Sequence, residues 1–272
     1  MLTVRQTLST AAAAAAVLTG ACQGGESHNQ GANAARQQTV PTLAIPVAKP
    51  VMDREQLLVA SLRAATAFVA GTDDRELQRS LSDRKFEFRI RFGCEGPGTE
   101  GAQEPFRWTY DPATRALKVR ATPALSLEDA PVKAIADEAF ETVEGFWLPQ
   151  PWLLAPVCLR HDEQAAEQAQ QARPSQQSVG IAQFFAKAGP RTLRRSGRPY
   201  EATTRLETDQ PPTAGFDLVL AGRLVALPDG QVIACTRSQS GERPACLISV
   251  EFGTVSIERA DTHEQLAQWG AG

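Results

Sequence analysis

The sequence predicts an α+β fold, in which antiparallel β-sheet carries a few short flanking helices. Several short segments alternate apolar with polar side chains, as half-buried strands do. Other segments place apolar residues at helical spacing behind a residue that can cap a helix. Hydrophobic residues make up 42% and charged residues 22% of the 272-residue chain, so most of it can fold around a core.

The first helix is expected directly after Met52, where the folded region begins. Asp53 can cap this helix, Gln56 stands three residues further on as in a capping box, and Gly71 can end it. A shorter helix follows, for which Asp73 is the expected cap. The apolar residues that share one face of the first helix, its expected core stripe, are Leu58, Leu62, Ala65 and Val69.

Three half-buried strands are expected next, at residues 84–92, 106–110 and 117–120. In the first of them Phe86 and Ile90 alternate with charged side chains, and a turn separates the second from the third. Three such strands in succession favour an antiparallel sheet.

The middle of the chain combines a helical pattern with two irregular segments. Apolar residues have helical spacing over residues 132–140, and Pro131 suits a first helical turn. Residues 145–152 are aromatic and rich in proline, so neither a helix nor a central strand is expected there. Residues 161–178 contain almost nothing that can be buried. They are expected to form a solvated loop and to mark the internal boundary.

The second part of the chain is expected to be mostly strand, with a short helix at residues 262–269. A turn at residues 228–230 predicts a hairpin. The expected strands are residues 179–186, 216–227, 231–235, 247–252 and 254–258. The globular region is residues 51–272, either as one domain or as two packed halves, residues 51–160 and 179–272.

The first 21 residues are typical of a secretory signal peptide. Arg5 gives a positive start, and an uncharged run rich in alanine follows up to Ala21. The segment LTGAC at residues 18–22 resembles the bacterial lipobox, with threonine where leucine is usual and Gly-Ala in place of Ala-Gly. The resemblance implies that Cys22 becomes the first mature residue and carries a diacylglycerol thioether and an N-acyl chain. The alternative is ordinary secretion, with cleavage after Ala21 and no lipid.

The cysteine count supports lipidation, because an odd number of cysteines is unusual in an exported protein. The chain has five. If Cys22 carries the lipid, four remain for bridges in an oxidising compartment. Four cysteines allow three pairings. Cys235 and Cys246 flank a turn-rich loop, which favours a bridge between them and leaves Cys94 with Cys158.

The residue after the lipobox cysteine bears on sorting. In the lipoprotein family an aspartate there commonly means retention in the inner membrane, and this chain has Gln23. The resemblance therefore implies an outer-membrane protein that faces the periplasm and is held firmly by its acyl chains. The alternative is a soluble periplasmic or secreted protein. Residues 22–50 are expected to be the lipidated N-terminus and a flexible tether with a reach on the order of 30 Å.

Charge and motif content weigh against several function classes. Lys and Arg number 28 against 31 Asp and Glu, a formal net charge of −3, so no nucleic-acid partner is expected. The sequence has no glycine-rich loop of the phosphate-binding kind. His28, His161 and His263 have neither the spacing of metal ligands nor that of a catalytic triad. Neither a metal nor a cofactor is therefore expected.

Two basic features are candidates for binding an anionic envelope component, such as a lipopolysaccharide phosphate. Guanidinium groups bind phosphate and carboxylate through paired hydrogen bonds. An irregular loop without acidic residues carries Arg191, Arg194, Arg195 and Arg198. A second basic face, on the first expected sheet, comprises Arg89, Arg91, Lys118 and Arg120, with Arg107 near them. The alternative for both is a solvated surface, or salt bridges to the acidic stretch 128–144.

Trp147 and Trp152 offer either core packing or a stacking platform for a glycan or peptide. Glu138, Glu141 and Glu144 precede Trp147 closely, and glycosidases use paired carboxylates. The alternative for these glutamates is a solvated acidic face.

The sequence thus favours a non-enzymatic lipoprotein that binds or structurally supports an envelope component. One alternative is a cell-envelope glycan hydrolase with paired carboxylates. Another is an accessory subunit that docks on a larger envelope complex through an exposed apolar surface.

Overall fold

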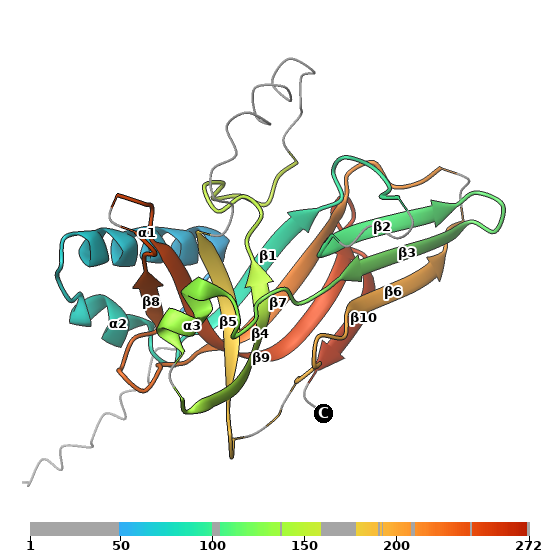
Figure 1. Ribbon diagram of the computed structural model, residues 1–272. Helices are drawn as coiled ribbons and strands as arrows, with labels where there is room; N and C mark the ends of the chain where they lie inside the picture. Colours follow the sequence, from blue (N-terminus) through green and yellow to red (C-terminus); the bar gives the residue numbers. More distant parts are fainter. Residues whose placement is uncertain are drawn as a thin grey trace, which may run out of the picture. The chain divides into compact units, whose positions relative to one another are not determined.

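The computed structural model describes residues 49–99, 104–136, 138–158, 178–189, 191, 193–207, 210–239 and 241–270. The expected signal peptide, nearly all of the tether and nearly all of the polar loop lie outside these residues. The described part is an α+β fold, which confirms the expected class (Figure 1). Its helices are α1 (Arg54–Val69), α2 (Arg75–Leu81) and α3 (Ala130–Ile135). Its strands are β1 (Lys85–Phe92), β2 (Phe106–Asp111), β3 (Ala116–Ala121), β4 (Phe140–Trp147), β5 (Val179–Ala186), β6 (Tyr200–Arg205), β7 (Phe216–Leu224), β8 (Ile233–Thr236), β9 (Ala245–Arg259) and β10 (Gln265–Gly270).

The larger sheet has seven strands and is built around β9. Five strands follow the order β1-β7-β9-β5-β4, and β8 and β10 also pair with β9. β8 and β5 flank the first part of β9, whereas β10 and β7 flank its second part (Figure 1). The strands pair antiparallel except for β5 with β9. Because β1 and β4 precede the polar loop and the other strands follow it, the two expected halves contribute to one sheet. The two strands expected at 247–252 and 254–258 are one continuous strand.

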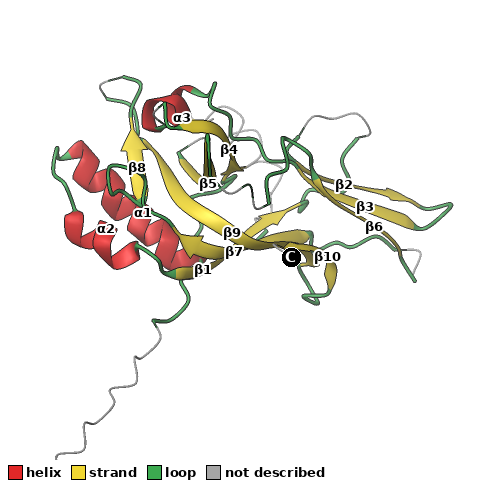
Figure 2. Cartoon of the chain, turned by 90° about the horizontal axis from the view of Figure 1, so that it is seen from below, coloured by secondary structure: helices red, strands yellow, loops and turns green. Residues whose placement is uncertain are grey.

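A smaller sheet of three strands, in the order β2-β3-β6, packs on the large sheet through aromatic side chains. Phe106 stacks on Phe146 with ring centroids 5.7 Å apart, and Trp108 meets Phe216 edge to face at 5.6 Å. Figure 2 shows this small sheet at one end of the described fold and the helices α1 and α2 at the other. The expectation that the first three strands share a sheet is wrong. β1 pairs along its whole length with β7, while β2 and β3 form a hairpin.

Helix α1 begins as the sequence predicts. The Asp53 carboxylate accepts a hydrogen bond from the backbone N–H of Gln56, and the Gln56 side chain accepts one from the N–H of Asp53. The expected core stripe is wrong in part, because Leu62 and Val69 are exposed. The residues that α1 does bury are Arg54, Leu57, Leu58, Ala60, Ser61 and Ala64. Several of these are small, which lets the helix lie close to the sheet.

The pattern at residues 132–140 contains both a helix and the start of a strand. α3 ends at Ile135, and β4 begins at Phe140 and continues through the aromatic segment to Trp147. β4 is an edge strand paired with β5, in line with the expectation that no central strand lies there. Asp74 rather than Asp73 caps α2, accepting a hydrogen bond from the N–H of Leu77.

The last element is a strand and not the expected helix. His263 has a φ of 56°, and the chain reverses direction there. The N–H of Arg259 donates to the carbonyl oxygen of Glu264, which closes the turn. β10 then pairs with the second part of β9, because that side of β9 has no other strand in the described fold. Sheet pairing outweighs the helical cap signal at Thr262.

Candidate functional site

Arg54, the first residue of α1, holds the loop of residues 148–158 against the edge strand β1. Its Nε donates a hydrogen bond to the carbonyl oxygen of Leu153 at 3.0 Å. Its two terminal nitrogens donate to the carbonyl oxygens of Gln150 at 2.9 Å and Arg89 at 3.0 Å. A planar guanidinium suits this task, because its donors form a fixed fork. One side chain therefore joins α1, β1 and the loop.

The Arg54 guanidinium is buried, with its carbon 5.0 Å from the centre of the Phe88 ring. Burial lowers the pKa of Arg54 to about 10, and the negative charge of Asp217 acts in the opposite direction. The Cys94–Cys158 disulfide fixes the far end of the same loop. The loop is thus held at two points.

The structure joins Cys94 to Cys158 and Cys235 to Cys246, which is the pairing that the sequence favours. The second bridge connects residues that stand directly opposite each other on β8 and β9. The lipidation candidate, Cys22, lies outside the described residues.

The two candidate platform tryptophans differ in exposure. Trp147 is only 9% exposed and packs with Ala182 and Leu247 in a small core cluster. Trp152, in the loop that Arg54 holds, is 51% exposed. Trp147 therefore has the core role, and the stacking-platform role of Trp152 stays a prediction.

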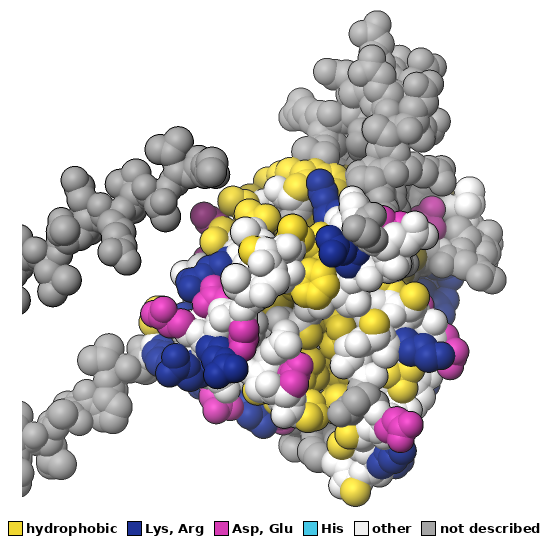
Figure 3. Space-filling model, turned by 60° about the vertical axis from the view of Figure 1, so that its left-hand side comes forward, with side chains coloured by type: hydrophobic (Ala, Val, Ile, Leu, Met, Phe, Trp, Pro, Cys, Tyr) yellow, Lys and Arg dark blue, Asp and Glu magenta, His cyan; other side chains and the backbone are white. Residues whose placement is uncertain are grey.

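The exposed large hydrophobic side chains of the described residues come from two neighbouring segments. α1 and its lead-in supply Val51, Val59, Leu62, Phe68 and Val69, and the loop supplies Trp152, Leu154 and Val157. Phe68 lies on the side of α1 that faces β8, where its ring is 6.0 Å from the guanidinium carbon of Arg237. We call the other seven residues the α1 patch. Figure 3 brings the α1 side of the molecule forward and shows hydrophobic side chains gathered on this face. Exposed apolar residues that gather in this way commonly mark a binding surface.

We call the loop that carries Arg191, Arg194, Arg195 and Arg198 the arginine loop. Its backbone binds a carboxylate of the chain itself. The buried side chain of Glu144, on β4, accepts hydrogen bonds from the backbone N–H of Arg195 at 2.7 and 2.8 Å and of Ser196 at 2.5 Å. Leu193, Ser196 and Gly197 have positive φ values of 57°, 54° and 76°. Successive N–H groups held this way form a concave anion-binding nest. Glu144 fills that nest.

The four arginine side chains of the loop also have partners within the chain. Arg191 and Arg194 form ion pairs with Glu141, at 3.1 and 2.5 Å. Arg195 donates to the carbonyl oxygen of Pro199, and Arg198 donates to that of Arg195. Repulsion between these arginines is therefore reduced without an external anion. Binding of an envelope anion by this loop stays a prediction.

Tyr200 lies beneath Arg195 and connects the two sheets. The Arg195 guanidinium is 4.8 Å from the Tyr200 ring centre, and the Tyr200 ring meets Trp269 of β10 edge to face at 5.1 Å. Burial first, and then the charge of Glu144, raise the pKa of Tyr200 to about 12, while Arg195 opposes the shift. Glu141 and Glu144 thus have structural partners, and Glu138 is exposed.

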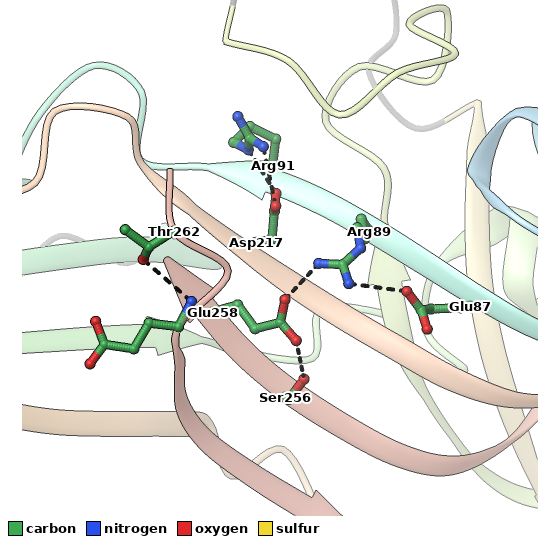
Figure 4. Close-up of polar contacts among 8 residues, drawn as sticks. Glu87, Arg89, Arg91, Asp217, Ser256, Glu258 and Thr262 are labelled. Atoms are coloured by element: carbon green, nitrogen blue, oxygen red, sulfur yellow. Dashed lines mark hydrogen bonds and ion pairs between the residues drawn. The ribbon is translucent and has the colours of Figure 1, made fainter. Parts of the chain in front are cut away.

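The expected second basic face is wrong, because β1 and β3 belong to different sheets. On β1, Arg89 pairs with Glu258 at 2.6 Å, and Arg91 makes two hydrogen bonds to the buried Asp217, at 2.7 and 3.1 Å (Figure 4). On β3, Lys118 pairs with Glu201 at 3.2 Å. Other strands of the same sheet supply the acids, so these basic side chains form ion pairs within the chain.

Within the described ranges no group of three or more His, Cys, Asp or Glu is placed to hold a metal ion. His263 lies in the turn before β10, whereas His28 and His161 lie outside those ranges. None of the helices in the described part of the chain has the length and apolarity needed to cross a bilayer.

Comparison of the chain with models of protein families, with curated proteins and with solved structures finds no match.

Sequence reasoning missed two charged residues that organise this region. Arg54 stands in the first turn of an amphipathic helix, where a charged side chain ordinarily faces water, so no local signal identified it. Asp217 interrupts an apolar strand segment, and a buried carboxylate requires a partner. That interruption was the available signal for the Arg91–Asp217 pair.

Proposed function

We propose that this protein is an exported lipoprotein, anchored through Cys22 to the outer membrane and facing the periplasm. Its folded region acts without catalysis, by binding or structurally supporting an envelope component. The lipobox resemblance and Gln23 are the basis for the anchor and its sorting.

The cysteine pairing is the observation that carries this proposal. Four of the five cysteines form two disulfides. Disulfides persist in oxidising compartments such as the periplasm, which supports export. The remaining cysteine is Cys22, the residue that the lipobox resemblance marks for acylation. An unpaired thiol in an exported protein calls for another use, and lipid attachment supplies one.

The charged side chains support binding rather than catalysis as the role of the folded region. Glu144 is held by the backbone of the arginine loop, and Glu141 by two of its arginines. These carboxylates stabilise the fold, so the hydrolase alternative gains no support from them. The α1 patch is instead the surface with apolar area available to a partner, and it also suits the accessory-subunit alternative.

Replacement of the anchoring cysteine tests the proposal. Cys22→Ser should move the protein out of the outer-membrane fraction, into the soluble periplasm or into an uncleaved precursor. Ser27→Ala, which lies outside the lipobox, is the matched control and should leave fractionation unchanged. Gln23→Asp should shift the mature protein toward the inner membrane. An unchanged mature mass and unchanged fractionation of Cys22→Ser would refute lipidation.

A further inference from the structure

We propose that the α1 patch docks on the surface of the same bilayer that carries the acyl chains of Cys22. This inference rests on the proposed lipid anchor. It adds an orientation: the folded region lies with α1 and the loop 152–157 against the lipid headgroups.

The two segments of the patch form one surface. Arg54, Leu58 and Leu62 follow each other at four-residue spacing, so they form one row along α1. That row begins at the hydrogen bonds from Arg54 to Gln150 and Leu153. Leu62, which is 68% exposed, therefore lies on the side of α1 that is turned toward the loop carrying Trp152.

The position of the tether favours a bilayer as the occupant. Lys49 is the first described residue, and Val51 belongs to the patch. Cys22 precedes Lys49 by 27 residues. The tether that the sequence predicts for this segment has a reach on the order of 30 Å, which would keep the patch near the anchoring lipid. Tethering at such a distance gives an effective concentration on the order of millimolar, and weak intrinsic affinity then suffices for docking.

The chemistry of the patch suits a lipid interface. Trp152 is an aromatic residue with one polar edge, the type that gathers at the headgroup level of membranes. A hollow of about 460 Å³ lies between Val51 and the loop residues 154–156. The acyl chains already anchor the protein firmly, so the apolar side chains need only orient the folded region on the bilayer.

Charge contributes little to the docking surface. The hollow is lined by three acidic side chains, Asp53, Glu55 and Glu87, and by two arginines, Arg54 and Arg89. Arg54 and Arg89 already bind groups of the chain. Burial of apolar area is therefore the driving force, and docking should depend on neither anionic lipid nor low salt.

The test uses the mature chain from Cys22 and the fluorescence of Trp152. With the other four cysteines in disulfides, Cys22 is the one free thiol, and a maleimide phospholipid can be coupled to it. Vesicles of phosphatidylethanolamine and phosphatidylglycerol are prepared with and without bromine on the acyl chains. Bromine should quench Trp152 in the coupled protein. Trp152→Phe should abolish most of that quenching, because Trp108 and Trp147 are buried and Trp269 is partly buried against Tyr200 on β10.

Matched variants identify the docking face. Leu62→Glu should weaken docking about tenfold, the effect expected when one apolar side chain no longer enters the interface. Gln268→Glu adds the same charge at an exposed position of β10 and should leave quenching unchanged. Salt at about 0.5 M should also leave quenching unchanged, since screening acts on charges.

Three outcomes would overturn the proposal. In the first, Trp152 has equal emission in brominated and plain vesicles. In the second, Leu62→Glu and Gln268→Glu are quenched alike. In the third, the emission of Trp152 would shift with protein concentration without vesicles, which would assign the patch to contact between two copies. Chemical coupling makes the test independent of lipidation in cells. A failed lipid anchor appears instead as an unchanged mass of Cys22→Ser.

Discussion

Replacing Glu144 with glutamine should destabilise the fold through the arginine loop. The carboxylate receives backbone N–H donors from Arg195 and Ser196 in a buried site. Glutamine keeps the shape but has one acceptor oxygen, and its amide group turns a donor toward other donors. Leu193 and Ser196 also have left-handed backbone conformations, which persist only while the surroundings hold them.

The size of the effect follows from these contacts. A hydrogen bond to a charged group contributes about 1.5–3 kcal/mol, and an unsatisfied buried donor costs about 1–3 kcal/mol. Glu144→Gln should therefore reduce the free energy of unfolding by about 2–4 kcal/mol. Glu141→Gln on the same strand is the control. Its ion pairs with Arg191 and Arg194 are partly exposed, so it should cost at most about 1 kcal/mol.

Two measurements check the prediction. Urea unfolding of the disulfide-intact protein, followed by tryptophan fluorescence, gives the free energies. Trypsin digestion tests the loop directly, because the bonds after Arg194 and Arg195 should become cleavable when Glu144 no longer holds the backbone there. The reasoning is refuted if Glu144→Gln unfolds within about 0.5 kcal/mol of the parent and shows no new tryptic site.

Three further predictions concern other contacts. Arg54→Met leaves the carbonyl oxygens of Gln150 and Leu153 without a donor, so amide hydrogen exchange should become faster in residues 150–156. Arg54→Lys should restore part of the protection of these amides. Equal exchange rates in both variants and the parent would contradict this prediction. The raised pKa of Tyr200 means that its phenol stabilises the fold fully below pH 10 and progressively less between pH 10 and 12. Over that range the parent should lose up to about 2–3 kcal/mol relative to Tyr200→Phe in urea unfolding, and parallel profiles would be the contrary result. In Gly222→Ala the new Cβ would collide with the carbonyl oxygen of Glu251, costing about 2 kcal/mol or more in thermal unfolding. Gly253→Ala, whose new Cβ would lie 3.7 Å from its nearest neighbour, should cost less than about 1 kcal/mol; similar losses in both would argue against a local clash.

Local patterns in the sequence predict several elements correctly. The alternation of phenylalanine and isoleucine with charged residues identifies β1, whose apolar side chains are buried. The capping box at Asp53 identifies the start of α1. Cys235 and Cys246 bracket a short turn-rich loop, and the bridge forms there. Each of these signals lies within a few residues of the feature that it predicts.

The candidate site was predictable only in part. The sequence indicates that the arginine loop suits an anion, but it does not indicate that Glu144, about 50 residues earlier, occupies the nest. The sequence gives Trp147 and Trp152 the same two possible roles, although Trp147 is buried and Trp152 is exposed. It gives the first helix an apolar stripe but assigns Leu62 to the core. The burial of each of these side chains depends on which distant part of the chain packs against its segment, and the local sequence does not contain that information.

The sequence by itself determines the α+β class and most of the strand positions, favours the disulfide pairing that the structure shows, and gives the expectation of a lipid anchor at Cys22. These follow from periodicity, turn residues and spacing, which are local. Only the tertiary structure decides that β1 leaves its sequence neighbours to pair with β7, which brings Arg91 to Asp217 across 126 residues. It also decides that Arg54 joins α1 to the loop, which places the exposed Trp152 beside that helix. Such pairings depend on burial and on long-range partners, because a buried charge is stable only beside its complement.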